Sequence, residues 1–218
     1  MALAIFDLDN TLIAGDSDHL WGGFLVARGL VDGARYAAAN DRFYAQYRNG
    51  TLDIDAFLRF ALSPLREHPR ARLEALRECF VAEVIAPLML PAARDLIAVH
   101  RAAGDTLLII TATNTFVGAP IAARFGIPHL IATEPELIDG RYTGEVAGIP
   151  AFREGKVRRL EDWLAGRGET LTGSSFYSDS HNDLPLLGRV DRPVAVDPDD
   201  TLREVAIERG WPILSLRG

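Results

Sequence analysis

Short apolar runs alternate with amphipathic stretches along most of this chain, and this alternation limits the folds that are open to it. The runs have the length of β-strands, and the first of them are apolar at nearly every position, as in strands whose two faces are both buried. Such a succession predicts an α/β fold with a doubly wound, mainly parallel sheet. We expect the strands at residues 2–6, 106–110, 129–133, 175–178, 193–196 and 213–216.

Helix and turn signals fill several of the intervals between these runs. Proline at the start and glycine after the end predict a helix over residues 91–103, and similar stop signals end helices over 154–164 and 201–208. The dipeptide Asp139-Gly140 lies between two apolar runs and predicts a β-hairpin over residues 136–146.

Residues 17–87 interrupt the alternation. They contain helical spacings of apolar residues but no convincing strand, and Asn49-Gly50 and Ser63-Pro64 separate the helical stretches. We therefore expect a core domain made of residues 1–15 and 88–218, with a helical insert over residues 16–87 that follows the first strand.

Composition narrows the classes of protein. The chain has 218 residues, of which 48% are hydrophobic, and a net charge of −7, so general binding to nucleic acid or to an anionic membrane has no electrostatic basis. The single cysteine cannot form an intramolecular disulfide, and neither a leader segment nor a long apolar span is visible. A cytoplasmic protein without membrane or nucleic-acid partners is expected, and its oligomeric state stays open.

An acidic pair, Asp7 and Asp9, follows the first predicted strand. Ligands of α/β folds bind at the carboxyl ends of strands, where two neighbouring carboxylates repel unless a cation binds or one carboxyl is protonated. A turn or helix cap is the alternative reading. A calcium loop is disfavoured because Leu12 stands where that loop needs glycine, and because a strand precedes it.

Two further polar groups follow predicted strands. Asp179 and Asp183 lie in a segment that could instead be a polar turn leading into a helix. Thr111 follows the strand at 106–110, where its hydroxyl and the amides after it would bind an anion, unless it merely ends the strand.

Lys156 is the one lysine among 23 basic residues, and it lies near the start of a predicted helix. A cation there opposes the helix dipole, so a compensating anion is expected nearby. Lysine binds phosphate as a compact point charge, whereas arginine imposes a planar fork. The alternative is an ordinary solvated lysine.

The order of these groups resembles the haloacid dehalogenase superfamily of phosphohydrolases. The resemblance spans the chain: Asp7-Leu-Asp9-Asn-Thr11 is similar to its first motif, Thr111 to the second, Lys156 to the third, and Asp179 with Asp183 to the fourth. The insert resembles that family's type 1 helical cap. Within the superfamily, the chain is most similar to the phosphoserine phosphatase-like branch and to a bacterial subgroup with histidinol-phosphatase-type members.

The resemblance implies a Mg²⁺-dependent phosphomonoesterase. It makes Asp7 the nucleophile that carries the phosphoryl group and Asp9 the general acid and base. It also assigns metal, phosphate and supporting positions. Mg²⁺ would be held by Asp7, the Asp9 carbonyl and Asp179, with Asn182 and Asp183 supporting the bound water. The phosphoryl oxygens would be held by Thr111, Ala112 and Lys156.

The resemblance leaves the substrate among small phosphorylated metabolites, with histidinol phosphate and phosphoserine foremost. Asp16 matches a cap glutamate of phosphoserine phosphatases that meets the substrate ammonium, whereas no single cap arginine is picked out by spacing. The expected substrate-binding residues are Asp16, Asp18, Arg48, Thr113 and Asn114. The alternatives are a phosphotransferase or mutase on the same scaffold, a non-enzymatic metal-binding protein, and a lipid-phosphate phosphatase.

Overall fold

Strand β1 (Leu3–Phe6) lies inside a six-stranded sheet in the computed structural model, which describes residues 2–217. It pairs in parallel with β2 (Thr106–Asn114) on one side and with β6 (Ser175–Ser178) on the other, in the order β3-β2-β1-β6-β7-β8. The strand order reverses beside β1, so a ligand crevice is expected at the carboxyl end of this strand. The remaining strands are β3 (His129–Thr133), β7 (Arg192–Val196) and β8 (Ile213–Leu214).

Both faces of the sheet are covered, which explains why β1 is apolar throughout. Leu3 and Ile5 pack in one core with helices α7, α8 and α9, whereas Ala4 and Phe6 pack in the other with α5 and α6. The helices run over Pro91–Ala102 (α5), Thr115–Phe125 (α6), Glu154–Ala165 (α7), Leu184–Leu187 (α8) and Asp200–Arg209 (α9).

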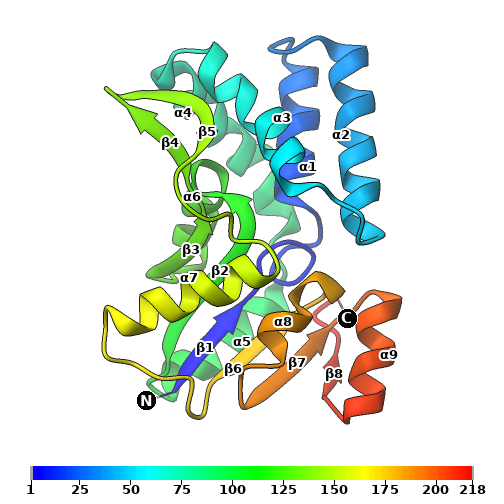
Figure 1. Ribbon diagram of the computed structural model, residues 1–218, viewed down its shortest axis with the longest axis vertical. Coiled ribbons are helices and arrows are strands. Elements are labelled where there is room, and N and C mark those ends of the chain that lie inside the picture. The colour runs from blue at the N-terminus through cyan, green and yellow to red at the C-terminus, as the bar shows by residue number, and fades with distance from the viewer. Residues whose placement is uncertain (1, 218) are drawn as a thin grey trace.

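The helical insert stands beyond the carboxyl ends of the strands (Figure 1). Stacked and edge-on contacts among Trp21, Phe24 and Phe80 form part of its interior. The two crossings between insert and core run side by side, because Ile13 forms an antiparallel bridge with Met89. The insert contains α1 (Ser17–Ala27), α2 (Gly33–Arg48), α3 (Ile54–Glu67) and α4 (Arg70–Phe80), followed by a π-helical turn at Val81–Ile85 and a 3-10 turn at Ala86–Leu88.

The predicted hairpin is present as β4 (Pro135–Ile138) and β5 (Arg141–Val146), which packs against α3 of the insert. Asp139 and Gly140 both have positive φ, 49° and 76°, as the tight two-residue turn requires.

The predicted fold class is confirmed, and the strand ends need correction. β2 continues to Asn114, because the chain stays extended past Ile110 while its pairing with β3 shifts register. β8 covers only residues 213–214 of the predicted 213–216. Residues 1 and 218, which were expected in the core domain, lie outside the described residues. Within residues 2–217, no helix is both long enough and apolar enough to cross a membrane.

Candidate active site

Lys156 joins two carboxylates at the carboxyl end of β1. Its Nζ donates to Asp7 Oδ1 at 2.8 Å and lies 2.7 Å from Asp183 Oδ1. Ser178 Oγ also donates to Asp183, at 2.7 Å. All four side chains are buried, with Lys156 only 3% exposed. Lys156 therefore has the anionic partners that its place near a helix start requires, and the solvated-surface reading is wrong.

The site carries more negative than positive charge. Burial raises the pKa of Asp7 to about 8, with Asp183 and Asp9 adding to the effect and Lys156 opposing it. Burial also disfavours the Lys156 ammonium, but its two carboxylate partners outweigh this and raise its pKa. The arrangement thus favours a second cation close to Asp7.

Asp9 is held from both the core and the insert. Its Oδ1 accepts from the backbone N–H of Ser17, the first residue of α1, at 2.6 Å. Its Oδ2 accepts from the hydroxyls of Thr113 at 2.7 Å and Thr111 at 3.3 Å. Both threonines lie in the part of β2 where the pairing shifts register, and such irregularities re-aim side chains at strand ends. Asp9 is therefore fixed in orientation beside Asp7.

Asp179 is tied to the loop that follows β1. Thr11 Oγ1 donates to Asp179 Oδ1 at 3.0 Å and accepts from the Asp179 backbone N–H at 3.1 Å. Burial and the nearby Asp7 carboxylate raise the pKa of Asp179 well above its usual range. The first and fourth predicted motifs thus meet at one edge of the sheet.

These residues suit a hard divalent cation. Asp7, Asp179 and the Asp9 carbonyl offer only oxygen donors, which is the ligand type that Mg²⁺ binds. A cation would also stabilise the ionised forms of two carboxylates that burial and mutual repulsion disfavour. Among residues 2–217, no cluster of three or more His, Cys, Asp or Glu side chains could hold a metal. The expected set needs only two such side chains, because its third ligand is a carbonyl.

A second acidic group comes from the insert. Asp16 caps α1 by accepting from the His19 backbone N–H at 2.8 Å, and Asp18 accepts from Asn114 Nδ2 at 2.9 Å. Burial and the neighbouring Asp9 raise the pKa of Asp16 to about 7, and burial beside Asp16 raises that of Asp18 well above its usual range. This end of the site would bind a cationic group.

A cavity lies between the insert and the core, over Asp7 and Asp9. It offers about 40 Å³ for the centres of water molecules, room for roughly three of them. Its walls combine acidic with aromatic side chains. Its lining includes Asp7, Asp9, Asp16, Asp18, His19, Asn40, Phe43, Tyr44, Tyr47, Phe57, Thr111, Ala112, Thr113 and Phe152, and no arginine or lysine of residues 2–217 is among the lining residues.

Of the expected substrate-binding residues, Asp16, Asp18 and Thr113 line the aromatic cavity, whereas Asn114 and Arg48 do not; the Asn114 side chain instead donates to Asp18 and caps α6. Arg48 lines a neighbouring polar cavity with Asp179 and His181, not the aromatic cavity. Arg48 is the last residue of α2, at the end of that helix that contacts the core through the Tyr47 carbonyl. Ser17 and Arg153 were missed. Ser17 binds Asp9 through its backbone, which residue type does not reveal.

Three comparisons with known proteins bear on this site. A profile described as haloacid dehalogenase-like hydrolase matches residues 4–188. A Neisseria meningitidis serogroup C (strain 8013) protein named histidinol-phosphatase is 51% identical over 219 residues, covering 99% of this chain and 99% of that protein. A Mycobacterium tuberculosis (strain ATCC 25618 / H37Rv) protein named phosphoserine phosphatase SerB1 is 36% identical over 221 residues, covering 99% of this chain and 71% of that protein.

A solved structure shares the whole architecture. The crystal structure of a protein of unknown function from Bordetella pertussis Tohama I superposes with a TM-score of 0.93 at 47% identity. The match covers 99% of this chain and 98% of that one. The helical insert and the core are therefore shared as a unit.

Proposed function

The chain belongs to the haloacid dehalogenase-like hydrolase family and is a phosphatase of that family, and from this premise we propose that it hydrolyses histidinol phosphate. The observation that carries the choice of substrate is the cavity, which is acidic and aromatic and has no cationic side chain among its described lining residues. We further propose that residues 16–87 act as a cap over a core made of residues 1–15 and 88–218.

Asp7 and Asp9 divide the first half of the reaction between them. A carboxylate oxygen of Asp7 bonds to phosphorus, the bond from phosphorus to the ester oxygen breaks, and Asp9 gives its proton to the leaving alkoxide. The Ser17 and Thr113 hydrogen bonds hold Asp9 in the orientation that this transfer needs. This half yields the free alcohol and a phosphoryl group on Asp7.

The second half of the reaction frees the Asp7 carboxylate from phosphorus and returns a proton to Asp9. Asp9, now ionised, takes a proton from water while the water oxygen bonds to phosphorus and the bond from phosphorus to Asp7 breaks. The water's other proton leaves with inorganic phosphate. Lys156 stays within hydrogen-bond distance of Asp7 and offsets charge on the phosphoryl oxygens, together with the Thr111 and Ala112 segment.

Asp7, the Asp9 carbonyl and Asp179 would hold Mg²⁺. When bound, the ion supplies the positive charge that allows an anionic phosphate ester to approach a carboxylate. Asn182 and Asp183 would support water bound to the ion, and Asp183 also fixes Lys156.

The cavity favours an amine without a carboxylate. Histidinol phosphate carries an ammonium, which suits Asp16 and Asp18, and an imidazole ring, which suits the aromatic wall. Phosphoserine would place an additional carboxylate among acidic side chains. Among residues 2–217, no arginine or lysine lines the cavity to offset the free-energy cost of removing that carboxylate from water.

Substrate preference is therefore a direct test. We expect kcat/KM for histidinol phosphate to exceed that for phosphoserine by roughly a hundredfold or more, because the carboxylate would be buried unpaired. Phosphate release from both esters with Mg²⁺ measures this ratio. A preference for phosphoserine would contradict the proposed substrate.

Asp16→Asn is the matched variant for that test. Asparagine keeps the oxygen that caps α1 but removes the charge expected to meet the ammonium. The variant should lose roughly tenfold in kcat/KM with histidinol phosphate and little with p-nitrophenyl phosphate, which has no ammonium. Equal losses with both esters would remove Asp16 from substrate recognition.

Metal removal gives a further prediction. We expect a chelator to abolish phosphate release and added Mg²⁺ to restore it, because Asp7 lacks a second cation without the ion. The thermal unfolding temperature should change little, since Lys156 keeps both carboxylate partners. Full activity in chelator would contradict the proposed metal site.

A further inference from the structure

The residue before α7 has an unusual backbone conformation. Arg153 has φ 49° and ψ −121°, a combination of backbone angles that residues other than glycine rarely adopt. The other described non-glycine residues with positive φ are Asn10, Asp139 and Asp197, whose types tolerate it better. Strain of this kind persists only where surrounding contacts hold it, and such contacts often mark a functional position.

The Arg153 side chain reaches from the core to the insert. Its Nε donates to Asn182 Oδ1 at 3.0 Å, and its Nη2 donates to the Gly50 carbonyl at 2.6 Å. Asn182 Nδ2 in turn donates to the Tyr47 carbonyl at 3.2 Å. We use the term clasp for the side chains of Arg153 and Asn182 together with the carbonyl groups of Gly50 and Tyr47, to which they donate. The clasp holds the end of α2 and the loop after it to the core.

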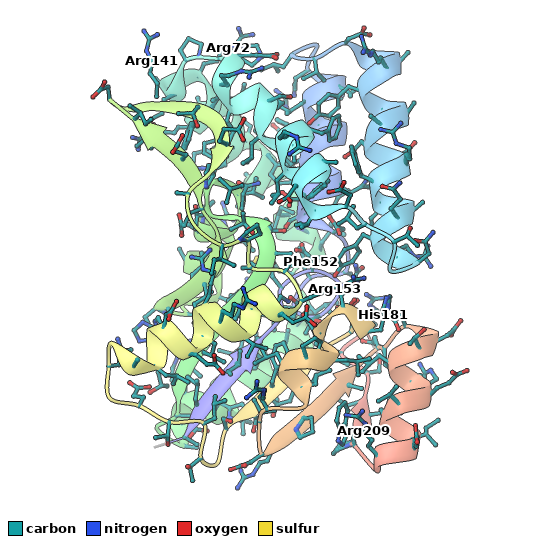
Figure 2. The ribbon with its side chains drawn as sticks, viewed as in Figure 1. Arg72, Arg141, Phe152, Arg153, His181 and Arg209 are labelled. Atoms are coloured by element: carbon teal, nitrogen blue, oxygen red, sulfur yellow. The ribbon has the colours of Figure 1, made fainter. Side chains whose placement is uncertain are left out.

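The contacts around the clasp are close. Gly50 lies so near His181 that an added Cβ would meet His181 Nε2 at 2.8 Å. The Arg153 guanidinium also lies 5.0 Å from the centre of the Phe152 ring. Figure 2 shows Phe152, Arg153 and His181 together where the core faces the insert.

The clasp is separate from the covalent link between the two parts. Both chain crossings lie together at the bridge between Ile13 and Met89, with a π-helical turn and a 3-10 turn beside them. A single paired crossing allows the insert to swing, and irregular helical turns are common at such hinges. Contacts away from the crossing then hold the insert closed, and the end of α2 provides one of them beside the packing of α3 on β5 and of Trp21 on Phe116.

The closed state has too little space for a substrate to enter. The cavity has room for roughly three water molecules, far fewer heavy atoms than a phosphorylated amine contains. The insert must therefore move away from Asp7 before a substrate binds.

We infer that Arg153 is a positioning residue that fastens the closed insert over Asp7 and ties closure to the phosphate-binding end of the site. Its carbonyl accepts from the Lys156 backbone N–H at 3.0 Å, and its side chain holds Asn182, the residue before Asp183. Arg153 thus links the end of α2 directly to the segment that carries Lys156 and to the segment that carries Asp183. The kinetic part of this inference rests on the proposed function.

Hydrogen exchange tests the clasp without any substrate. The amides of residues 49–51 are hydrogen-bonded at the end of α2, so their exchange reports whether this end stays docked. Arg153→Gly removes the side chain and relieves the backbone strain. We expect it to speed exchange in residues 46–52 by roughly tenfold to a hundredfold, the effect of losing charged hydrogen bonds.

Two further variants sharpen this measurement. Arg153→Lys keeps the charge and one contact, so its exchange should lie between wild type and Arg153→Gly. Arg158→Ala removes an exposed arginine from α7, the helix that begins after Arg153, and should leave exchange unchanged. Unchanged exchange in Arg153→Gly would overturn the clasp. If that variant does not fold, wild-type exchange in Arg153→Lys would overturn it instead.

Kinetics distinguish closure from chemistry. Because the closed state has no room for a substrate, loss of the clasp raises the open, binding-competent population, so Arg153→Gly should lower KM for histidinol phosphate roughly tenfold and change kcat less. A fall in kcat at constant KM would overturn the positioning role. If the wild type does not hydrolyse histidinol phosphate, the proposed substrate fails, and faster exchange in Arg153→Gly would still support the clasp.

Discussion

Asp7→Asn is expected to fold and to lose at least about four orders of magnitude in phosphate release, because an amide cannot replace the carboxylate as nucleophile. Asparagine has the same shape and keeps an oxygen that can accept from Lys156 Nζ. Lys156 also keeps Asp183, so the free energy of unfolding should change by no more than about 2 kcal/mol. Phosphate release from histidinol phosphate and p-nitrophenyl phosphate, with thermal unfolding in parallel, measures both effects.

Asp95→Asn is the matched control for this variant. Asp95 is exposed on α5, so the same chemical change there should leave turnover and stability near wild type. Hydrolysis by Asp7→Asn at the wild-type rate would remove Asp7 from the reaction. That result would also favour the alternative in which Asp7 and Asp9 only stabilise a turn or a helix cap.

Lys156→Met is expected to lower the free energy of unfolding by about 3–5 kcal/mol, since it leaves two buried carboxylates without their shared cation. Turnover should fall to the limit of detection, because the charge that offsets the phosphoryl oxygens is lost as well. Urea unfolding followed by circular dichroism gives the stability change, and phosphate release gives the activity.

Two companion variants separate charge from shape at this position. Lys156→Met combined with Asp183→Asn removes one uncompensated charge, so it should recover part of the stability but none of the activity. Lys156→Arg keeps the charge, yet its planar fork does not fit a site where lysine is 3% exposed. We expect this variant to lose roughly a hundredfold to a thousandfold in turnover. Wild-type stability in Lys156→Met would contradict the buried ion pair.

The fold could be predicted from the sequence where the pattern of apolar residues indicates that both faces of a strand are buried. The near-continuous apolar run that became β1 packs into one core through Leu3 and Ile5 and into the other through Ala4 and Phe6, as a central parallel strand must. The end of β2 was not predictable in this way. Beyond Ile110 the residues turn polar although the backbone stays extended, because their side chains serve the site.

The candidate site was predictable where strand ends carry its side chains. Parallel strands bring their carboxyl ends to one edge, so Asp7 and Asp183 both contact Lys156, and Thr11 contacts Asp179, across long stretches of sequence. The family resemblance that these residues suggested is confirmed. Contacts between insert and core could not be predicted, because Ser17 and Gly50 act through backbone groups. Arg153 also gives no signal in a chain so rich in arginine.

The measurement that tests the central claim most directly is rapid acid quenching of a single turnover with ³²P-labelled histidinol phosphate, followed by peptide mapping. We predict that the label appears transiently on the peptide that contains Asp7, ahead of free phosphate, and never in Asp7→Asn. Asp9→Asn should slow both the formation and the decay of the label, because Asp9 protonates the leaving alkoxide and then activates the water. Release of phosphate by the wild type while the peptide with Asp7 stays unlabelled throughout the turnover would contradict the account.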